Sequence, residues 1–354
     1  MPHHPRRLAA LAAGVLAALT VSLLPASAPA AVRAPTGPPD TLQHPLRLER
    51  GPAPRVISMV GNVVRFPGGR TVTFTPPAEV TGGARLIGAW RRDAIVWAPY
   101  GAGRSAAFRV RPSGRVVRVG EPHRDLFRGG EWQIAGDVLY VASTDARYRT
   151  RLAKVSLVDG TVRRTWISTE EEFWTLLDVT PHRALIGSSR VLKAWRGDGT
   201  FERVWVQAGN RYSDVRFASL RHGWFANATS DGTELRRISQ PDRVVWKQGF
   251  ENEMIPFDLS GDGSVLLTTE YETYSPQMRD VRTGRILRTY EGGYNDAFND
   301  NDQLVLEGSR AFLVVMNLRI DGKHREVLVR CTIGGDCERA SRVASRITLQ
   351  TYGS

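Results

Sequence analysis

Short apolar runs rich in β-branched and aromatic residues recur along the chain and are separated by clusters of Gly, Asp, Ser and Asn. Runs of this kind, bounded by turn residues, are typical of β-strands. Clear examples are residues 94–98, 138–141 and 265–268. No segment has an apolar stripe of helical period that continues for more than two turns. The pattern therefore predicts an all-β protein.

A tight turn followed by a strand-like segment occurs seven times along the chain. The turns lie roughly 40–50 residues apart, from Gly160 to Gly199 at the closest and from Gly284 to Gly335 at the widest. Gly, Asp and Pro supply the positive φ or the fixed bend that such turns need. This period, with several short strands per unit, predicts a seven-bladed β-propeller of four-stranded antiparallel blades. The turns are at residues 67–70, 112–115, 158–161, 197–200, 240–243, 282–285 and 333–336.

The propeller is expected to span residues 51–354, with its ring closed by pairing of the two chain ends. Closure in this way removes an open sheet edge. We expect that residues 346–352, which are strand-like, or residues 46–48 complete a blade begun at the other end of the chain. In the seventh blade, residues 311–318 are expected to form an additional or a lengthened strand.

Residues 1–30 have the pattern of a secretory signal peptide. Arg6 and Arg7 precede a long apolar run, and small residues suited to cleavage follow Pro25. The alternative is a membrane anchor, because the run is close to spanning length. Residues 31–50 are rich in proline and are expected to form a linker. No later apolar run is long enough to span a bilayer, so the exported chain is expected to be extracellular or in the cell envelope.

Two segments resemble blades of known propeller families. Residues 258–266, with the sequence Asp-Leu-Ser-Gly-Asp-Gly-Ser-Val-Leu, resemble the turn between the first two strands of a TolB-like or WD40-like blade. Residues 280–290 are similar to the outer hairpin of WD40-like and quinoprotein-like blades. The chain as a whole resembles secreted bacterial, actinobacterial-like propellers of these types. The paired motifs of true WD40 repeats and the docking motifs of quinoprotein dehydrogenases are absent, so the resemblance implies a fold and no named activity.

The chain carries a formal net charge of +12. Basic proteins can bind nucleic acid, but the arginines are spread along the strands and form no block. Arginine also greatly outnumbers lysine, which together with the abundance of Ala, Gly and Val indicates a GC-rich genome. We therefore expect no nucleic-acid partner. The four lysines are Lys154, Lys193, Lys247 and Lys323.

The two cysteines, Cys331 and Cys337, flank the seventh predicted turn. Opposed residues in an antiparallel hairpin bring their Cα atoms within disulfide range. With an export signal, a disulfide is preferred over a metal-binding pair. We expect this disulfide to clasp the last blade, and no sequence pattern calls for a cofactor.

Loops that enter the innermost strand of each blade and loops that join its second and third strands crowd around one face of a propeller. Here these loops carry aromatic residues beside acids and arginines, a combination suited to stacking on a ligand and orienting it. The alternative for Trp132 and Trp174 is packing between blades. The predicted ligand-binding residues are Trp132, Trp174, Tyr212, Asp214, Glu253, Tyr274, Tyr294 and Asp296.

Other polar clusters have structural alternatives that we favour. Residues 170–172 are three consecutive glutamates, for which a solvated loop is favoured over a cation site. Residues 299–302 alternate Asn and Asp but lack the glycine and distal glutamate of a calcium loop. No histidine pair and no Gly-x-Ser-x-Gly elbow indicates catalysis. No metal site is therefore predicted.

The sequence favours a secreted, monomeric and non-catalytic propeller that binds a protein or a glycan through its aromatic-rich loop face. An alternative is a propeller enzyme that acts on polysaccharide as a glycosidase or lyase. Its catalytic carboxylates would be Asp214, Glu253 or Asp296. The distance between paired carboxylates would distinguish such an enzyme from a non-catalytic binding protein. A second alternative is a cell-envelope scaffold that resembles TolB.

Overall fold

The computed structural model describes residues 40–42, 44–124, 130–145, 147, 149–169, 173–208, 213–249, 254–270, 273–292 and 303–350. The expected signal peptide, half of the expected linker (residues 31–39 and 43), and the acidic clusters at 170–172 and 299–302 lie outside these residues.

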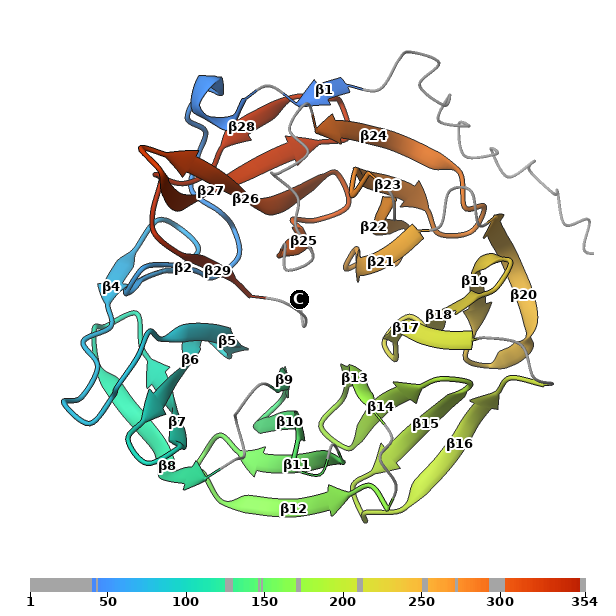
Figure 1. Cartoon of the computed structure of the whole chain (residues 1–354), viewed down its shortest axis with the longest axis horizontal. Helices are drawn as coiled ribbons and strands as arrows, with labels where there is room; N and C mark the ends of the chain where they lie inside the picture. Colours follow the sequence, from blue (N-terminus) through green and yellow to red (C-terminus); the bar gives the residue numbers. More distant parts are fainter. Residues whose placement is uncertain are drawn as a thin grey trace, which may run out of the picture. The chain divides into compact units, whose positions relative to one another are not determined.

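Seven antiparallel four-stranded sheets are arranged as blades around a central axis, so the protein is a seven-bladed β-propeller (Figure 1). From the innermost strand outward, blade 1 contains β29 (Ile347–Leu349), β2 (Ser58–Val60), β3 (Val63–Arg65) and β4 (Thr71–Thr73). Blade 2 contains β5 (Arg85–Trp90), β6 (Asp93–Tyr100), β7 (Arg104–Val110) and β8 (Val116–Arg124). Blade 3 contains β9 (Glu131–Ala135), β10 (Val138–Thr144), β11 (Thr150–Ser156) and β12 (Val162–Ile167). Blade 4 contains β13 (Thr175–Val179), β14 (Arg183–Ser188), β15 (Val191–Arg196) and β16 (Phe201–Val206).

The remaining blades follow the same order. Blade 5 contains β17 (Ser213–Ser219), β18 (Trp224–Thr229), β19 (Gly232–Arg237) and β20 (Gln240–Gly249). Blade 6 contains β21 (Met254–Leu259), β22 (Val265–Glu270), β23 (Pro276–Asp280) and β24 (Ile286–Gly292). Blade 7 contains β25 (Leu304–Leu306), β26 (Ala311–Ile320), β27 (Lys323–Thr332) and β28 (Cys337–Arg339). One short 3₁₀ helix, η1 (Pro45–Arg47), is the only helix within the described part of the chain.

The second strand of each blade is buried on both faces, which explains why these strands read as continuous apolar runs. In β10, Leu139 and Val141 pack toward blade 2, whereas Val138 and Tyr140 pack toward blade 4. Successive side chains of a strand point to opposite faces of its sheet. The hydrophobic core is accordingly divided into seven clusters, each of which joins two neighbouring blades.

Every boundary between neighbouring blades also has a hydrogen bond at or near the innermost strands. Each of these inter-blade hydrogen bonds satisfies a polar group that would otherwise be left unpaired between sheets. In ring order the pairs are Thr348 with Leu86, Trp90 with Asp137, Glu131 with Leu176, Asp178 with Leu220, Thr233 with Met254, Asp258 with Leu306, and Gln303 with Leu349.

The ring is closed by the C-terminal part of the chain, as expected. Strand β29 pairs antiparallel with β2, so that Met59 lies opposite Thr348, and it forms the innermost strand of blade 1. Near the other end, β1 (Asp40–Leu42) pairs parallel with β24 and becomes a fifth, outer strand of blade 6 (Figure 1). In blade 7, β26 is a lengthened second strand, and the described residues of this blade contain no additional strand.

Six of the seven predicted turns join the third and fourth strands of a blade, and the fifth prediction was wrong. Gln240 is the first residue of β20, and the turn of blade 5 consists of Ile238 and Ser239. Pro241 is tolerated inside β20 because this outer strand is at the edge of its sheet. The register shifts on both sides of Arg236, which accommodates the extra residues between the strands.

Cys331 and Cys337 lie directly opposite each other in β27 and β28, with Cα atoms 4.2 Å apart, and form the expected disulfide. The six-residue separation closes a short loop. We expect reduction to lower the free energy of unfolding by about 2 kcal/mol, because short loops restrict the unfolded chain only slightly. Urea denaturation with and without reductant measures this. A Cys331→Ala/Cys337→Ala variant should not respond to reductant, and an unchanged urea midpoint in the reduced wild type would contradict the expectation.

Candidate functional site

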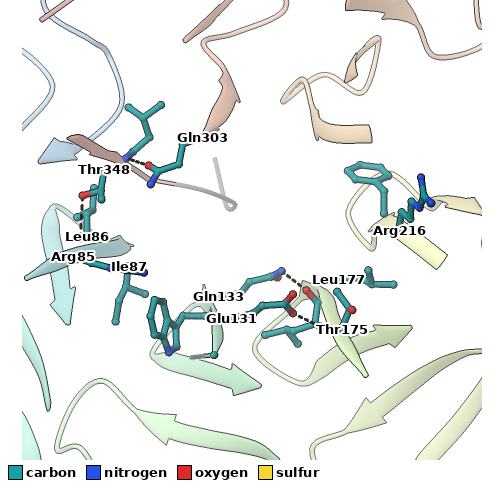
Figure 2. Close-up of a pocket in the computed structure, with 15 residues that line it drawn as sticks. Arg85, Leu86, Ile87, Glu131, Gln133, Thr175, Leu177, Arg216, Gln303 and Thr348 are labelled. Carbon is teal, nitrogen blue, oxygen red and sulfur yellow. Dashed lines mark hydrogen bonds between the residues drawn. The ribbon is translucent and has the colours of Figure 1, made fainter. Parts of the chain in front are cut away.

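The innermost strands surround a cavity of about 280 Å³ (Figure 2). Arg85, Glu131 and Thr175 are the first residues of β5, β9 and β13, so the cavity lies where the chain enters the innermost strands. This is one of the two loop sets from which the sequence predicted a ligand face. Its volume is close to the lower limit of small-molecule sites, about 300 Å³. The other lining residues are Leu86, Ile87, Gly130, Trp132, Gln133, Leu176, Leu177, Arg216, Phe217, Gln303, Thr348 and Leu349.

Arg85 contributes a positive charge to the cavity wall. Its side chain is exposed to the cavity, and within the described residues no carboxylate pairs with it. Partial burial, followed by repulsion from Arg346, lowers the pKa of the Arg85 guanidinium. The group stays charged at neutral pH because an arginine pKa starts far above that range.

Glu131 contributes a negative charge on the neighbouring innermost strand. Its Oε2 accepts a hydrogen bond of 2.7 Å from the backbone N–H of Leu176 in blade 4. Protein surrounds the carboxyl on most sides although it remains accessible from the cavity, and this loss of hydration raises the pKa of Glu131. In the part of the chain that the structure describes, no cationic side chain is paired with it.

Two further polar side chains shape the cavity wall. Gln133 is buried, and its Nε2 donates to the carbonyl of Leu176 at 3.0 Å, so Glu131 and Gln133 both bind the same residue of blade 4. Arg216 lies on the blade 5 side and forms an ion pair of 3.4 Å with Asp214. Arg85 and Glu131 therefore differ from Arg216 in being open to a ligand's charges.

The structure brings only part of the predicted ligand-binding set to this cavity. Trp132 lines it and stacks on Trp97 of blade 2, with ring centroids 5.7 Å apart. Trp174 is only 5% exposed and belongs to the cluster between blades 3 and 4, with Lys193 Nζ 4.2 Å from its ring centroid. Trp174 is therefore an inter-blade packing residue, which was the stated alternative. Its neighbour Phe173 is 62% exposed.

The other predicted residues are not assembled with the cavity by the described structure. Tyr274 lies between β22 and β23, with φ 51°, and packs against the cluster between blades 6 and 7. The positions of Tyr212, Glu253, Tyr294 and Asp296 lie outside the described residues. The pairing of Asp214 with Glu253 or Asp296 that an enzyme would need therefore stays a prediction.

Sequence analysis did not select Arg85. One signal was present: Arg85 directly precedes a predicted strand, at the same place in its blade as Glu131 in the next. That signal was weak because arginine is distributed along the whole chain.

A second, smaller cavity of about 140 Å³ contains two buried aspartates, Asp178 and Asp258. A β-bulge in β13 and another in β21 precede these residues, and such irregularities redirect a side chain. Each carboxylate accepts two backbone N–H bonds, one from the next residue and one from the neighbouring blade. Both carboxylates therefore bind neighbouring blades to each other. Within the described residues, no group of three or more metal-ligating side chains occurs.

Burial raises the pKa of Asp178 and that of Asp258 to about 6, from 3.8, and Asp178 adds to the shift of Asp258 by repulsion. Between about pH 4 and pH 6 the folded state therefore binds more protons than the unfolded state, so the stability that protonation provides is lost as pH rises through this window. We expect each group to cost about 3 kcal/mol above pH 6.

Urea denaturation from pH 4.5 to pH 7.5 checks this expectation. The free energy of unfolding should fall with rising pH, and the Asp258→Ala variant should show a shallower slope even though it is less stable. A free energy that rises across the window would contradict the expectation. Carboxylates whose pKa is lowered, such as Asp159 with a pKa of about 2, affect stability only at lower pH.

Comparisons with known proteins identify the fold and no family. No protein-family model and no curated protein matches the sequence. The solved structure of puromycin hydrolase matches at a TM-score of 0.54 and 15% identity over 87% of this chain, which spans 57% of that protein. An uncharacterized protein, lmo1340 from Listeria monocytogenes EGD-e, matches at a TM-score of 0.50 and 11% identity, covering 77% of this chain and 86% of that one. At these identities the likeness establishes a shared β-propeller fold.

Proposed function

We propose that the protein is a binding protein whose partner engages the face at which the innermost strands begin, with the central cavity as its specific site. One observation carries the proposal: an arginine and a glutamate that have no charged partner among the described residues open into the same cavity (Figure 2). Elsewhere in the described ring, carboxylates such as Asp178 and Asp258 are occupied by backbone N–H groups. The partner is a protein or a glycan, and Trp132, which packs against the cluster between blades 2 and 3, lines the cavity beside the two charges.

The same proposal places the protein outside the cytoplasm. The signal-like sequence of residues 1–30 and the disulfide support this location, because disulfides persist in oxidising compartments. Among the described residues, none forms a helix with the length and hydrophobicity needed to traverse a bilayer. We further propose that the exported protein is a monomer without a nucleic-acid partner. Mass spectrometry of the exported protein tests the cleavage site.

A peptide and glycan array probed with the protein lacking residues 1–30 tests the binding function. We expect at least one ligand whose binding falls about tenfold or more in an Arg85→Gln or Glu131→Gln variant, since a charged hydrogen bond contributes about 1.5–3 kcal/mol. Arg282→Gln, an exposed substitution in the turn between β23 and β24, is the matched control. Array ligands that bind both cavity variants as they bind the wild type would refute the cavity as the site.

A further inference from the structure

We propose that the central cavity recognises a zwitterion of the amino-acid or short-peptide class, with its carboxylate bound by Arg85 and its ammonium group bound by Glu131. This inference rests on the proposed cavity site and assigns to it a small ligand of the peptide class in place of a whole protein or a glycan. The two residues begin β5 and β9, the innermost strands of adjacent blades, and both side chains line the same cavity (Figure 2). One small molecule can therefore lie between them.

The two charges stay apart in the described structure. No ion pair joins Arg85 to Glu131, and Oε2 of Glu131 is held by the backbone N–H of Leu176 in blade 4. That hydrogen bond, at 2.7 Å, directs the Glu131 side chain toward blade 4, whereas Arg85 belongs to blade 2, on the other side of blade 3. A ligand that carries both charges can bridge the gap without breaking the contact that joins blades 3 and 4.

The balance of charge selects among ligand classes. A simple anion would leave Glu131 without a counter-ion, and a simple cation would leave Arg85 without one. An uncompensated charge in a poorly hydrated site is costly, so each of these ligands forfeits part of its binding energy. Arg216 does not disturb this balance because Asp214 is paired with it, and Arg346, which repels Arg85, is not among the residues that line the cavity. A zwitterion satisfies both sides of the cavity at once.

The protonation equilibria agree with this placement. The pKa of Glu131 is raised and that of Arg85 is lowered, and burial is the largest cause of each shift. Each group has thus lost water without gaining an opposite charge from the described protein. A bound ammonium and a bound carboxylate would supply those charges.

Isothermal titration of the protein lacking residues 1–30 with three probes tests the proposal: L-alanyl-L-alanine, its N-acetyl derivative and its C-terminal amide. We expect the free dipeptide to bind about 10- to 100-fold more tightly than either blocked form, because each block removes one charged hydrogen bond. Glu131→Gln should abolish discrimination against the N-acetyl form, and Arg85→Gln discrimination against the amide. Glu131→Gln retains an oxygen that can accept from Leu176, so the wall is preserved.

Arg282→Gln is the control and should behave as the wild type. Equal binding of the free and blocked dipeptides by the wild type would overturn the proposal, as would no binding of the free dipeptide at millimolar concentration. Retention of both discriminations in the variants would also overturn it. If array ligands depend on Arg85 and Glu131 while end-blocking has no effect, the binding function stands and the zwitterion assignment fails. If neither an array ligand nor the free dipeptide depends on these residues, the proposed cavity function itself fails.

Discussion

Replacing both Ile347 and Leu349 by alanine is expected to lower the free energy of unfolding by about 4–10 kcal/mol, because each buried aliphatic side chain cut to alanine costs about 2–5 kcal/mol. The two side chains are 2% and 1% exposed and pack in the cluster between blades 7 and 1. They belong to β29, the strand that closes the ring. The loss is comparable to the whole stability of a typical domain, about 5–15 kcal/mol.

Urea denaturation followed by tryptophan fluorescence measures this loss. The matched control is Val158→Ala, which alters an apolar side chain that is 62% exposed and should change the stability by less than about 0.5 kcal/mol. A loss below about 2 kcal/mol in the double variant, the least expected for one such truncation, would show that closure of the ring does not depend on these contacts.

Arg330→Met is expected to destabilise the protein by about 3–5 kcal/mol, because removing one member of a buried ion pair leaves its partner uncompensated. The Arg330 guanidinium donates to Glu307 and Glu338 at 2.6 Å each, and to the backbone carbonyls of Pro52 and Ala53 at 3.0 and 3.2 Å. The side chains of Arg330 and Glu307 are 7% and 6% exposed. This one side chain therefore binds the segment before blade 1 to blade 7.

A triple variant separates charge from packing. Arg330→Met combined with Glu307→Gln and Glu338→Gln should recover a large part of the lost stability, because no unpaired charge then remains buried. Arg330→Lys should still be destabilised, since an ammonium group cannot reproduce the planar set of five donors. Urea denaturation compares the variants. Equal stability of Arg330→Met and the wild type would contradict the assigned role.

The blade architecture was predictable because each blade repeats the same local sequence features: short apolar strands joined by turns with characteristic residues. The turn between β23 and β24 shows this: Asp280 accepts hydrogen bonds from Thr283, and Gly284 has a φ of 71°. Both features are readable from residue types alone. Closure by residues 347–349 was predictable for the related reason that an unpaired strand-like tail remained. The fifth turn was misplaced because Pro241 and Asp242 are typical turn residues but lie on an edge strand. Such a strand pairs with a neighbour on one side only, so it tolerates residues that a central strand would not.

The cavity was less accessible to sequence reasoning. Glu131 and Trp132 lie at a predicted strand start, whereas Arg85 looks like any other arginine of a chain rich in them. The sequence did not indicate that Asp178 and Asp258 are buried beside the same cavity, because their burial depends on bulges that shift the register by one residue. Trp174 shows the converse: an aromatic residue at a strand start is as well suited to filling the space between two sheets as to contacting a ligand.

The inter-blade hydrogen bonds limit how the blades can be exchanged. Blades 4 and 6 both reach the following blade through an aspartate placed by a bulge, Asp178 in one and Asp258 in the other. Blade 3 reaches its neighbour through Glu131, whose side chain is longer and starts from the opposite end of its strand. A chimera in which blades 4 and 6 trade places keeps the same kind of contact to the following blade, an aspartate that binds a backbone N–H, whereas moving blade 3 does not. Although the blades repeat one architecture, the contacts between neighbouring blades differ, so each blade is suited to its own position in the ring.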